Sequence, residues 1–275
     1  METSWLTSVP RVQAVPESCS GVGLIRSKLQ GAATHLGIST AVAACVLAVV
    51  FLGWYRAPLD TVSGVGEILK ILLAVDVVLG PVLTLVVFDR RKTSLRFDLT
   101  CIALMQVAGL AYGVYAVEAG RPHHLVFVKD RFEVISRSDL QLEDRKAAAG
   151  NGAADAEWLG PKVVAAEMPA SANERKELLF ESAFGGRDLQ HFPKQYRDYA
   201  TQAPRAAAKG LPLSVLLALN PNGHRILQSA IDRSGLPEDR LKFLPVKGPR
   251  ADAAMLVDAS SGSVKGMVGL MPWQE

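Results

Sequence analysis

The sequence predicts a membrane protein, with three N-terminal transmembrane α-helices followed by a periplasmic α+β domain. Of the 275 residues, 49% are hydrophobic, and nearly all the long uncharged runs lie before residue 121. After residue 121 the pattern changes to short β-rich runs at both ends of the region, with helical stretches between them. We expect residues 1–35 to form a disordered cytoplasmic tail, 36–120 the three-helix transmembrane region and 121–275 the domain.

Three apolar runs are long enough to cross a bilayer as helices. The first, 36–55, has 20 residues without a charge and ends in the aromatic pair Trp54-Tyr55. A helix of that length spans about 30 Å of hydrocarbon, and this aromatic pair is typical of the membrane interface. The second run, about 68–88, carries one charge in its body, Asp76, and the third, 99–117, carries none.

Basic residues in the short flanks predict the orientation of these helices. The loop between the second and third runs carries four of them, Arg90, Arg91, Lys92 and Arg96. Positively charged loops stay in the cytoplasm. The N-terminus is then also cytoplasmic, and everything after residue 121 lies in the periplasm of a bacterial inner membrane.

The region after residue 121 reads as strands at both ends with helices between them. Runs rich in β-forming residues lie at 123–136, 161–168, 241–246, 254–259 and 264–272. The first run is broken at 129–131, and residues 260–263 have the composition of a hairpin turn between the last two.

Three helical patterns fill the middle of this region. Ser171 and Glu174 have the spacing of a capping box, which predicts a helix that ends at Gly185-Gly186. Further helical stretches are expected at 193–209 and 223–234, each closed by a glycine.

Asp76 is the most informative single residue, because a carboxylate within a membrane helix costs several kcal/mol unless it is protonated, paired or facing water. It is either a partner-recognition or ion-relay group, or a helix–helix tether, for instance to Gln106 of the third run. Gly80-Pro81 and Thr84 follow within the same helix, and together with Asp76 they predict a polar, bent segment. Such a segment is more typical of packing than of catalysis.

Gly109 and Gly113 of the third run form a GxxxG spacing, which places two glycines on one helix face and permits the close approach of another helix. The approaching helix belongs either to this chain or to a partner.

Searches for enzymatic and metal-binding motifs find none. The sequence contains no GxSxG, HExxH, Walker A, CxxC or complete GxGxxG pattern, and no two histidines stand at i, i+4. His123 and His124 are adjacent, so in a strand they point to opposite faces, which favours packed or solvated histidines over a metal site. Residues 121–275 carry 21 basic and 19 acidic side chains, a balance that disfavours nucleic-acid binding. We therefore expect no catalytic residues, no cofactor and no metal.

Four segments together resemble the TfpX/TfpZ family of type IV pilin accessory proteins. They are DVVLGPVLTLVVF (76–88), LRFDLTCIALMQVAGLAYGVY (95–115), RPHHLVFVKDRFEVI (121–135) and MVGLMPW (267–273). The resemblance covers about residues 30–275. It implies a non-enzymatic inner-membrane protein that modulates pilin availability or pilus assembly. The partners it implies are a type IV pilin, through its membrane helix and its periplasmic head, and the lipid bilayer, with no nucleic acid.

The residues expected to bind a partner combine the polar membrane segment, the glycine pair and positions that match the family. They are Asp76, Gly80, Pro81, Thr84, Gln106, Gly109, Gly113, Arg121, Asp130 and Arg131. The hypothesis places the pilin helix against the second and third helices, with the pilin head on the periplasmic domain, whose edge strands are one docking route. The alternative is a membrane-anchored periplasmic ligand sensor or transport-coupling subunit in which Asp76 relays ions.

Overall fold

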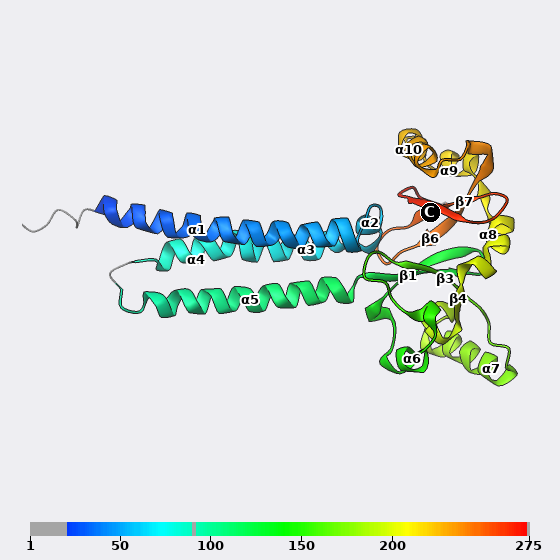
Figure 1. The fold of residues 1–275 in the computed structure, drawn as a ribbon, viewed down its shortest axis with the longest axis horizontal. Coiled ribbons are helices and arrows are strands. Elements are labelled where there is room, and N and C mark those ends of the chain that lie inside the picture. Colours follow the sequence, from blue (N-terminus) through cyan, green and yellow to red (C-terminus); the bar gives the residue numbers. More distant parts are fainter. Residues whose placement is uncertain (1–20, 90–91, 274–275) are drawn as a thin grey trace, which may run out of the picture.

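The computed structural model describes residues 21–89 and 92–273, with three long helices at one end and a mixed helix and sheet domain at the other (Figure 1). Three helical segments are long and apolar enough to cross a membrane: Gly23–Trp54, Val65–Val87 and Leu95–Ala119. The three predicted apolar helices are therefore confirmed, each with an earlier start than the apolar run alone indicates. Arg90, Arg91 and Cys19 lie outside the described residues.

The first membrane helix begins well before the predicted apolar run. It consists of α1, Gly21–Ala48, continued by a π-helical turn at Val49–Trp54. Residues 21–35 are thus helical and not part of a disordered tail. Tertiary contacts support the extension: Lys28 Nζ donates to the carbonyl of Val86 at 3.1 Å, and the Phe88 ring lies against Gly31.

The second membrane helix is continuous but changes its winding in the middle. Helix α3, Val65–Leu73, passes into a π-helical segment, Ala74–Leu79, and then into α4, Gly80–Val87. The third membrane helix is α5, Leu95–Ala119. The α3–α4 helix packs against both α1 and α5 and lies between them (Figure 1).

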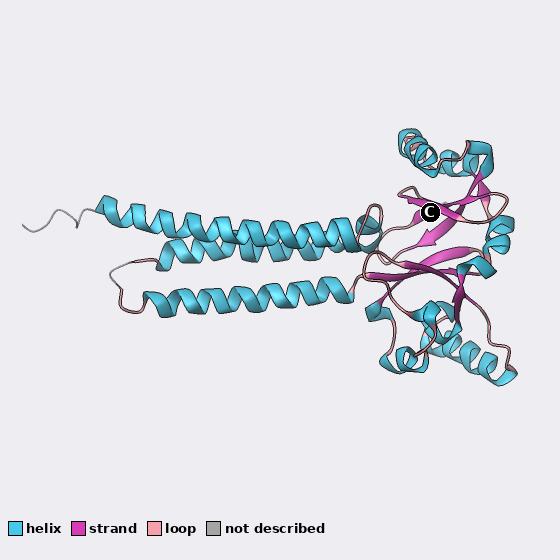
Figure 2. Cartoon of the chain, viewed as in Figure 1, coloured by secondary structure: helices cyan, strands magenta, loops and turns pink. Residues whose placement is uncertain are grey.

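The described strands form one mixed eight-stranded sheet in the order β4-β3-β1-β2-β6-β7-β8, with β5 paired to β6 (Figure 2). Their bounds are β1 Pro122–Val128, β2 Arg131–Ser136, β3 Lys162–Ala166, β4 Tyr196–Asp198, β5 Leu211–Pro212, β6 Leu241–Lys247, β7 Ala253–Asp258 and β8 Val264–Val268. Two pairs are parallel, β1 with β3 and β2 with β6. The predicted break at 129–131 is the turn between β1 and β2.

Five α-helices accompany this sheet in the part of the domain that the structure describes. They are α6 Leu142–Ala147, α7 Ala172–Phe180 with a π-helical continuation at Glu181–Gly185, α8 Ala203–Lys209, α9 Leu213–Leu219 and α10 His224–Ser234. Short 3₁₀ turns lie at Arg137–Asp139, Gly152–Ala154, Leu189–His191, Pro193–Gln195, Tyr199–Thr201 and Glu238–Arg240. Helices α6 and α7 lie on the β4 side of the sheet, and α9 and α10 on the β8 side (Figure 1).

Successive side chains of β1 point to opposite faces of the sheet, and each face is covered by a different hydrophobic core. Leu125 and Phe127 face a central cluster, whereas Val126 and Val128 face a cluster that includes Leu178 of α7. The central cluster also contains two residues from outside the predicted domain, which belong to α2, Leu59–Ser63, in the loop between the first two membrane helices. Leu59 and Val62 are buried there among the strand side chains. A third cluster, of Leu216, Leu227, Phe243 and others, lies under α9 and α10.

The predicted helix at 193–209 is wrong in its first half. Tyr196 lies in β4 and pairs with Ala166 of β3, and only Ala203–Lys209 is α-helical. The capping box at Ser171 is also wrong, because Ser171 makes no side-chain cap hydrogen bond, and Glu174 pairs with Lys194 at 2.8 Å. The helix itself begins after Ser171 as expected.

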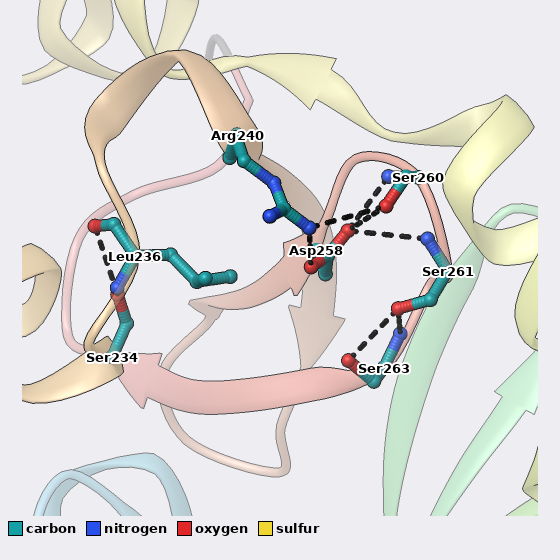
Figure 3. A network of polar contacts seen from close by, with 7 residues as sticks. All are labelled: Ser234, Leu236, Arg240, Asp258, Ser260, Ser261 and Ser263. Carbon is teal, nitrogen blue, oxygen red and sulfur yellow. Dashed lines mark hydrogen bonds and ion pairs between the residues drawn. The ribbon is translucent and has the colours of Figure 1, made fainter.

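The predicted turn between β7 and β8 is confirmed, and Asp258 organises it (Figure 3). Its carboxylate accepts hydrogen bonds from the backbone amides of Ser260 and Ser261, at 2.8 and 3.1 Å. Arg240 pairs with it at 2.8 Å. The serine donors, and then Arg240, hold the pKa of Asp258 well below its usual range. The turn packs on the domain through Tyr199, whose hydroxyl donates to the Gly262 carbonyl at 2.6 Å.

Candidate functional site

Asp76 lies at the midpoint of the span Val65–Val87, within the π-helical segment. The residue is 8% exposed, and its Oδ1 atom is buried without a hydrogen-bond partner among the described residues. An aspartate at the centre of a membrane helix costs about 2.5–3.5 kcal/mol on insertion scales. Asp76 is therefore a polar group that the fold of this chain leaves unsatisfied.

Gln106 reaches Asp76, but through the backbone. Its Nε2 atom donates to the Asp76 carbonyl oxygen at 3.2 Å. In the π-helical winding the amide of Gly80 donates to the carbonyl of Val75, five residues back. The carbonyl of Asp76 would next need the amide hydrogen of Pro81, which proline lacks. Gln106 supplies the missing donor from α5.

Gly80 makes room for this contact. A Cβ atom built at Gly80 would collide with the side-chain amide of Gln106. The second and third helices are therefore joined by three residues that act together, Gly80, Pro81 and Gln106. The proline lacks a hydrogen-bond donor, the glutamine supplies one from the neighbouring helix, and the glycine lets the glutamine side chain approach. The predicted tether between the two helices exists, but it ends on the carbonyl of Asp76 and not on its carboxylate.

Thr84 connects the second helix to the first. Its hydroxyl lies 2.5 Å from Nδ1 of His35 on α1. Thr84 is buried, and both residues line a hollow between α1 and α5 whose floor is α4. We call this hollow the helix groove. It has a volume of about 460 Å³ and is lined by Gln30, Gly31, Thr34, His35, Ile38, Thr84, Phe88, Leu99 and Ala103.

The two glycines of the GxxxG spacing have different surroundings. A Cβ atom at Gly113 would collide with Leu72 of α3, so this glycine packs within the chain. A Cβ atom at Gly109 would meet nothing within 4 Å. The structure thus uses one glycine for the fold and leaves the other on an open helix face.

Arg121 lies where the third membrane helix meets the domain, and it is buried. Its guanidinium stacks between Trp54 and Trp158, 5.3 and 5.8 Å from the two ring centroids. It also donates to the carbonyl oxygen of Trp158 at 2.5 Å and lies 3.1 Å from Nε2 of His123. These contacts fix the domain on the membrane helices and engage the guanidinium within the chain, although its buried Nε atom has no hydrogen-bond partner among the described residues.

The two adjacent histidines are packed, as the sequence indicates. Burial, followed by the nearby Arg121 charge, lowers the pKa of His123 from its usual 6.5 to about 4. Burial and the neighbouring His123 lower the pKa of His124 to about 4 as well. The His124 ring lies edge-on to Tyr196 at 5.1 Å between centroids. Within the described ranges no three His, Cys, Asp or Glu side chains gather to hold a metal ion.

Asp130 and Arg131 lie at the β1–β2 turn, at the end of the domain away from the membrane helices. Asp130 is exposed, and Arg131 begins β2 and pairs with Glu133 at 2.9 Å. The preceding Lys129 adopts a positive φ of 58° and pairs with Asp188 at 3.0 Å. Lys129 and Leu179 of α7 line a common pocket of about 310 Å³.

Helix α7 carries an exposed aromatic pair beside this pocket. Phe180 and Phe184 are 64% and 78% exposed, and their ring centroids lie 4.7 Å apart. We call Leu179, Phe180 and Phe184 the distal apolar surface, because α7 lies at the far end of the domain (Figure 1). The sequence predicts this helix but does not indicate which of its faces is exposed. His35 is not among the predicted site residues, because the sequence predicts a tail over residues 1–35.

Comparisons with known proteins point to fimbrial assembly. The profile of a family described as Fimbrial assembly protein FimB matches residues 24–64. The chain is similar to the fimbrial assembly protein of serogroup I of Dichelobacter nodosus, 28% identical over 238 residues, which is 85% of this chain and 91% of that protein. The fimbrial assembly protein of serogroup E1 is 25% identical over 237 residues, with the same shares.

A third relative from Dichelobacter nodosus, the fimbrial assembly protein of serogroups C1 and C2, is 28% identical over 123 residues, 44% of this chain and 92% of that protein. No solved structure matches the chain at a significant level. The likeness extends from the membrane helices into the domain and supports a role in fimbrial assembly.

Proposed function

We propose that this chain is an inner-membrane accessory protein of type IV pilus assembly that binds pilin without catalysis. The observation that carries the proposal is the similarity to fimbrial assembly proteins over 85% of the chain, which includes both the membrane helices and the domain. The three apolar helices and the attached domain supply the two surfaces that a protein needs to handle a membrane-anchored subunit with a head outside the bilayer.

The helix groove is the place where a pilin helix binds. It opens between α1 and α5 and has a floor made by α4. Gln30, Thr34 and His35 bring polar groups into it within the membrane span, where interhelical hydrogen bonds add to close packing. The face formed by Gly80, Pro81 and Gln106 is filled by contacts within the chain and does not line the groove, so these three residues do not touch the pilin.

Gly109 and Asp76 keep roles in this proposal. Gly109 lies on the open face of α5, where a second helix can approach closely. Asp76 does not line the groove and its unpartnered Oδ1 atom is buried, so a pilin helix supplies a donor to it only if the helices shift when pilin binds.

The pilin head contacts the end of the domain away from the bilayer. The distal apolar surface and the neighbouring turn at Lys129 and Asp130 lie together there. This orientation requires the domain to be periplasmic. The end of α4 and the start of α5 lie at the opposite end of the helices from the domain (Figure 1), which supports such a topology.

Site-specific photocrosslinking in the native membrane tests the proposal. A photoreactive residue at Ala103, which lines the helix groove, is expected to form an adduct with the major pilin. The matched control is Ala108, also exposed on α5 but outside the groove. Equal adducts at both positions would reject the groove as the binding site. If cells shown to express pilin give no pilin adduct and no pilin in a crosslinked pull-down, the proposed function is wrong.

A further inference from the structure

The loop 155–160, between the 3₁₀ turn Gly152–Ala154 and β3, carries two large exposed apolar side chains beside the end of a membrane helix. Trp158 is 67% exposed and Leu159 is 55% exposed. Single exposed apolar residues are ordinary, but two adjacent ones at this place in the fold call for a physical account.

Three contacts hold the loop at the level of the helix end. The amide of Gly160 donates to the carbonyl oxygen of Gly53 at 3.1 Å. The ring of Trp158 lies edge-on to that of Trp54, with centroids 5.5 Å apart. A Cβ atom built at Gly53 would lie 3.2 Å from Cδ2 of Leu159. Gly53 and Trp54 are the last two residues of the span Gly23–Trp54.

The end of a membrane span marks the depth of the lipid headgroups. A loop fixed to the last two residues of the span therefore has the same depth. Tryptophan prefers this zone, because its large ring is apolar and its indole N–H can bond to water or to headgroups. Leucine beside it reaches toward the acyl chains.

We propose that the loop 155–160 inserts Trp158 and Leu159 into the headgroup region of the bilayer, as a fourth membrane contact of this chain besides its three helices. Arg121 holds the carbonyl of Trp158 from inside the domain, so insertion fixes the tilt of the domain on the membrane. The loop also carries two exposed acidic residues, Asp155 and Glu157. The binding is therefore apolar and does not depend on anionic lipids.

Spin labelling of the full-length protein in bilayers tests this contact. Cys19, Cys45 and Cys101 are replaced by alanine, and a nitroxide is attached to Leu159→Cys or to Leu142→Cys. Leu142 is a matched control, a leucine of the same domain that is 53% exposed but lies on α6. The measurement compares how often the nitroxide collides with oxygen, which concentrates in lipid, and with a nickel chelate, which stays in water.

The label at 159 is expected to have an oxygen-to-nickel accessibility ratio several-fold higher than the label at 142. The ratio should be unchanged when the anionic lipid fraction or the salt concentration is varied. A ratio at 159 equal to that at 142 would place the loop in water and overturn the proposal. A label at 159 shielded from both reagents would also overturn it, because protein and not lipid would then cover the loop.

A second measurement avoids the cysteine substitutions. The emission of Trp158 is the difference in fluorescence between the wild-type protein and the Trp158→Phe variant. Lipids brominated near the headgroup are expected to quench this difference. If that part of the emission is not quenched, Trp158 does not contact lipid, whatever the labelled variants show.

Discussion

Gln106 donates its side-chain amide to the backbone carbonyl of Asp76, 3.2 Å away on the neighbouring helix. The contact replaces a hydrogen bond that Pro81 cannot make, and it turns a helix-breaking residue into part of a helix–helix interface. The Oδ1 atom of the same Asp76 is buried without a partner among the residues that the structure covers. One residue thus provides both a structural contact and a free polar group at the centre of the span.

We expect Gln106→Leu to lower the free energy of unfolding by about 1 kcal/mol, because the Asp76 carbonyl would lose its donor inside the membrane. Gly80→Ala should destabilise by about 1–3 kcal/mol through the collision with the Gln106 amide. The double variant Gly80→Ala/Gln106→Ala should lose less stability than the sum of Gly80→Ala and Gln106→Ala measured singly. Thermal unfolding in detergent measures these differences. Gly109→Ala, which adds a methyl group to open space within α5, is the control and should not lower stability.

Asp76→Asn separates the two roles of this residue. The side-chain amide has nearly the same shape and no charge, so folding should be preserved or improved. Pilin crosslinking in the helix groove and surface piliation should both fall, because the new side chain presents a different set of donors and acceptors. Unchanged piliation at unchanged expression would show that Asp76 has no part in recognition.

Arg121→Gln should weaken the packing between the domain and the membrane helices. The guanidinium stacks on two tryptophans and donates to a backbone carbonyl. Its loss should therefore lower the free energy of unfolding by about 2 kcal/mol or more. We expect faster proteolysis at the 155–160 loop and a lower thermal midpoint. Arg137→Gln removes another arginine at the same junction, one that forms a more exposed ion pair with Glu118, and should cost less than about 1 kcal/mol. Equal effects of the two changes would contradict this assignment.

Acid should destabilise the domain through His123 and His124. Both have a pKa of about 4 in the folded chain against a usual value of 6.5. Above pH 6.5 both states are neutral, whereas between 6.5 and 4 only the unfolded chain takes up protons, so stability falls across this window as the pH drops. For His124, a pKa shift of this size corresponds to a loss of about 3 kcal/mol in the free energy of unfolding. Thermal unfolding between pH 7 and 4.5 should show this fall, and His124→Gln should flatten it.

Local patterns in the sequence predicted most of the elements. The apolar runs predicted the three long helices. Three predicted ends of strands or helices are also confirmed: the break at 129–131, the turn at 260–263 and the glycine at 235. The local pattern predicts a helix at Tyr196, whereas the structure has a strand there. That strand has only three residues and forms by pairing with β3, which is distant in the chain, so no local pattern indicates it. Helix α9 is a short apolar run, which periodicity alone cannot assign.

The polar membrane residues were identified from the sequence, but their contacts were not. Asp76, Pro81 and Gln106 stand out by type, yet the link between carbonyl and amide depends on a π-helical winding that no sequence pattern specifies. The burial of Arg121 depends on Trp54, at the end of the first membrane helix, and on Trp158, in a loop about 100 residues further along the chain. The exposed pair on α7 is visible only once the face that packs on the sheet is known.

The burial of Leu59 and Val62 in the central core has a consequence for how this protein is made. Residues 59–63 leave the ribosome before the strands that surround them. In the topology proposed above, they reach the far side of the membrane as the loop of a hairpin formed by the first two helices. With that topology the domain can close its core only after this step, so membrane insertion would precede its folding. A secreted fragment beginning at residue 121 would have a hole in place of these two side chains and should not be expected to fold as a soluble unit.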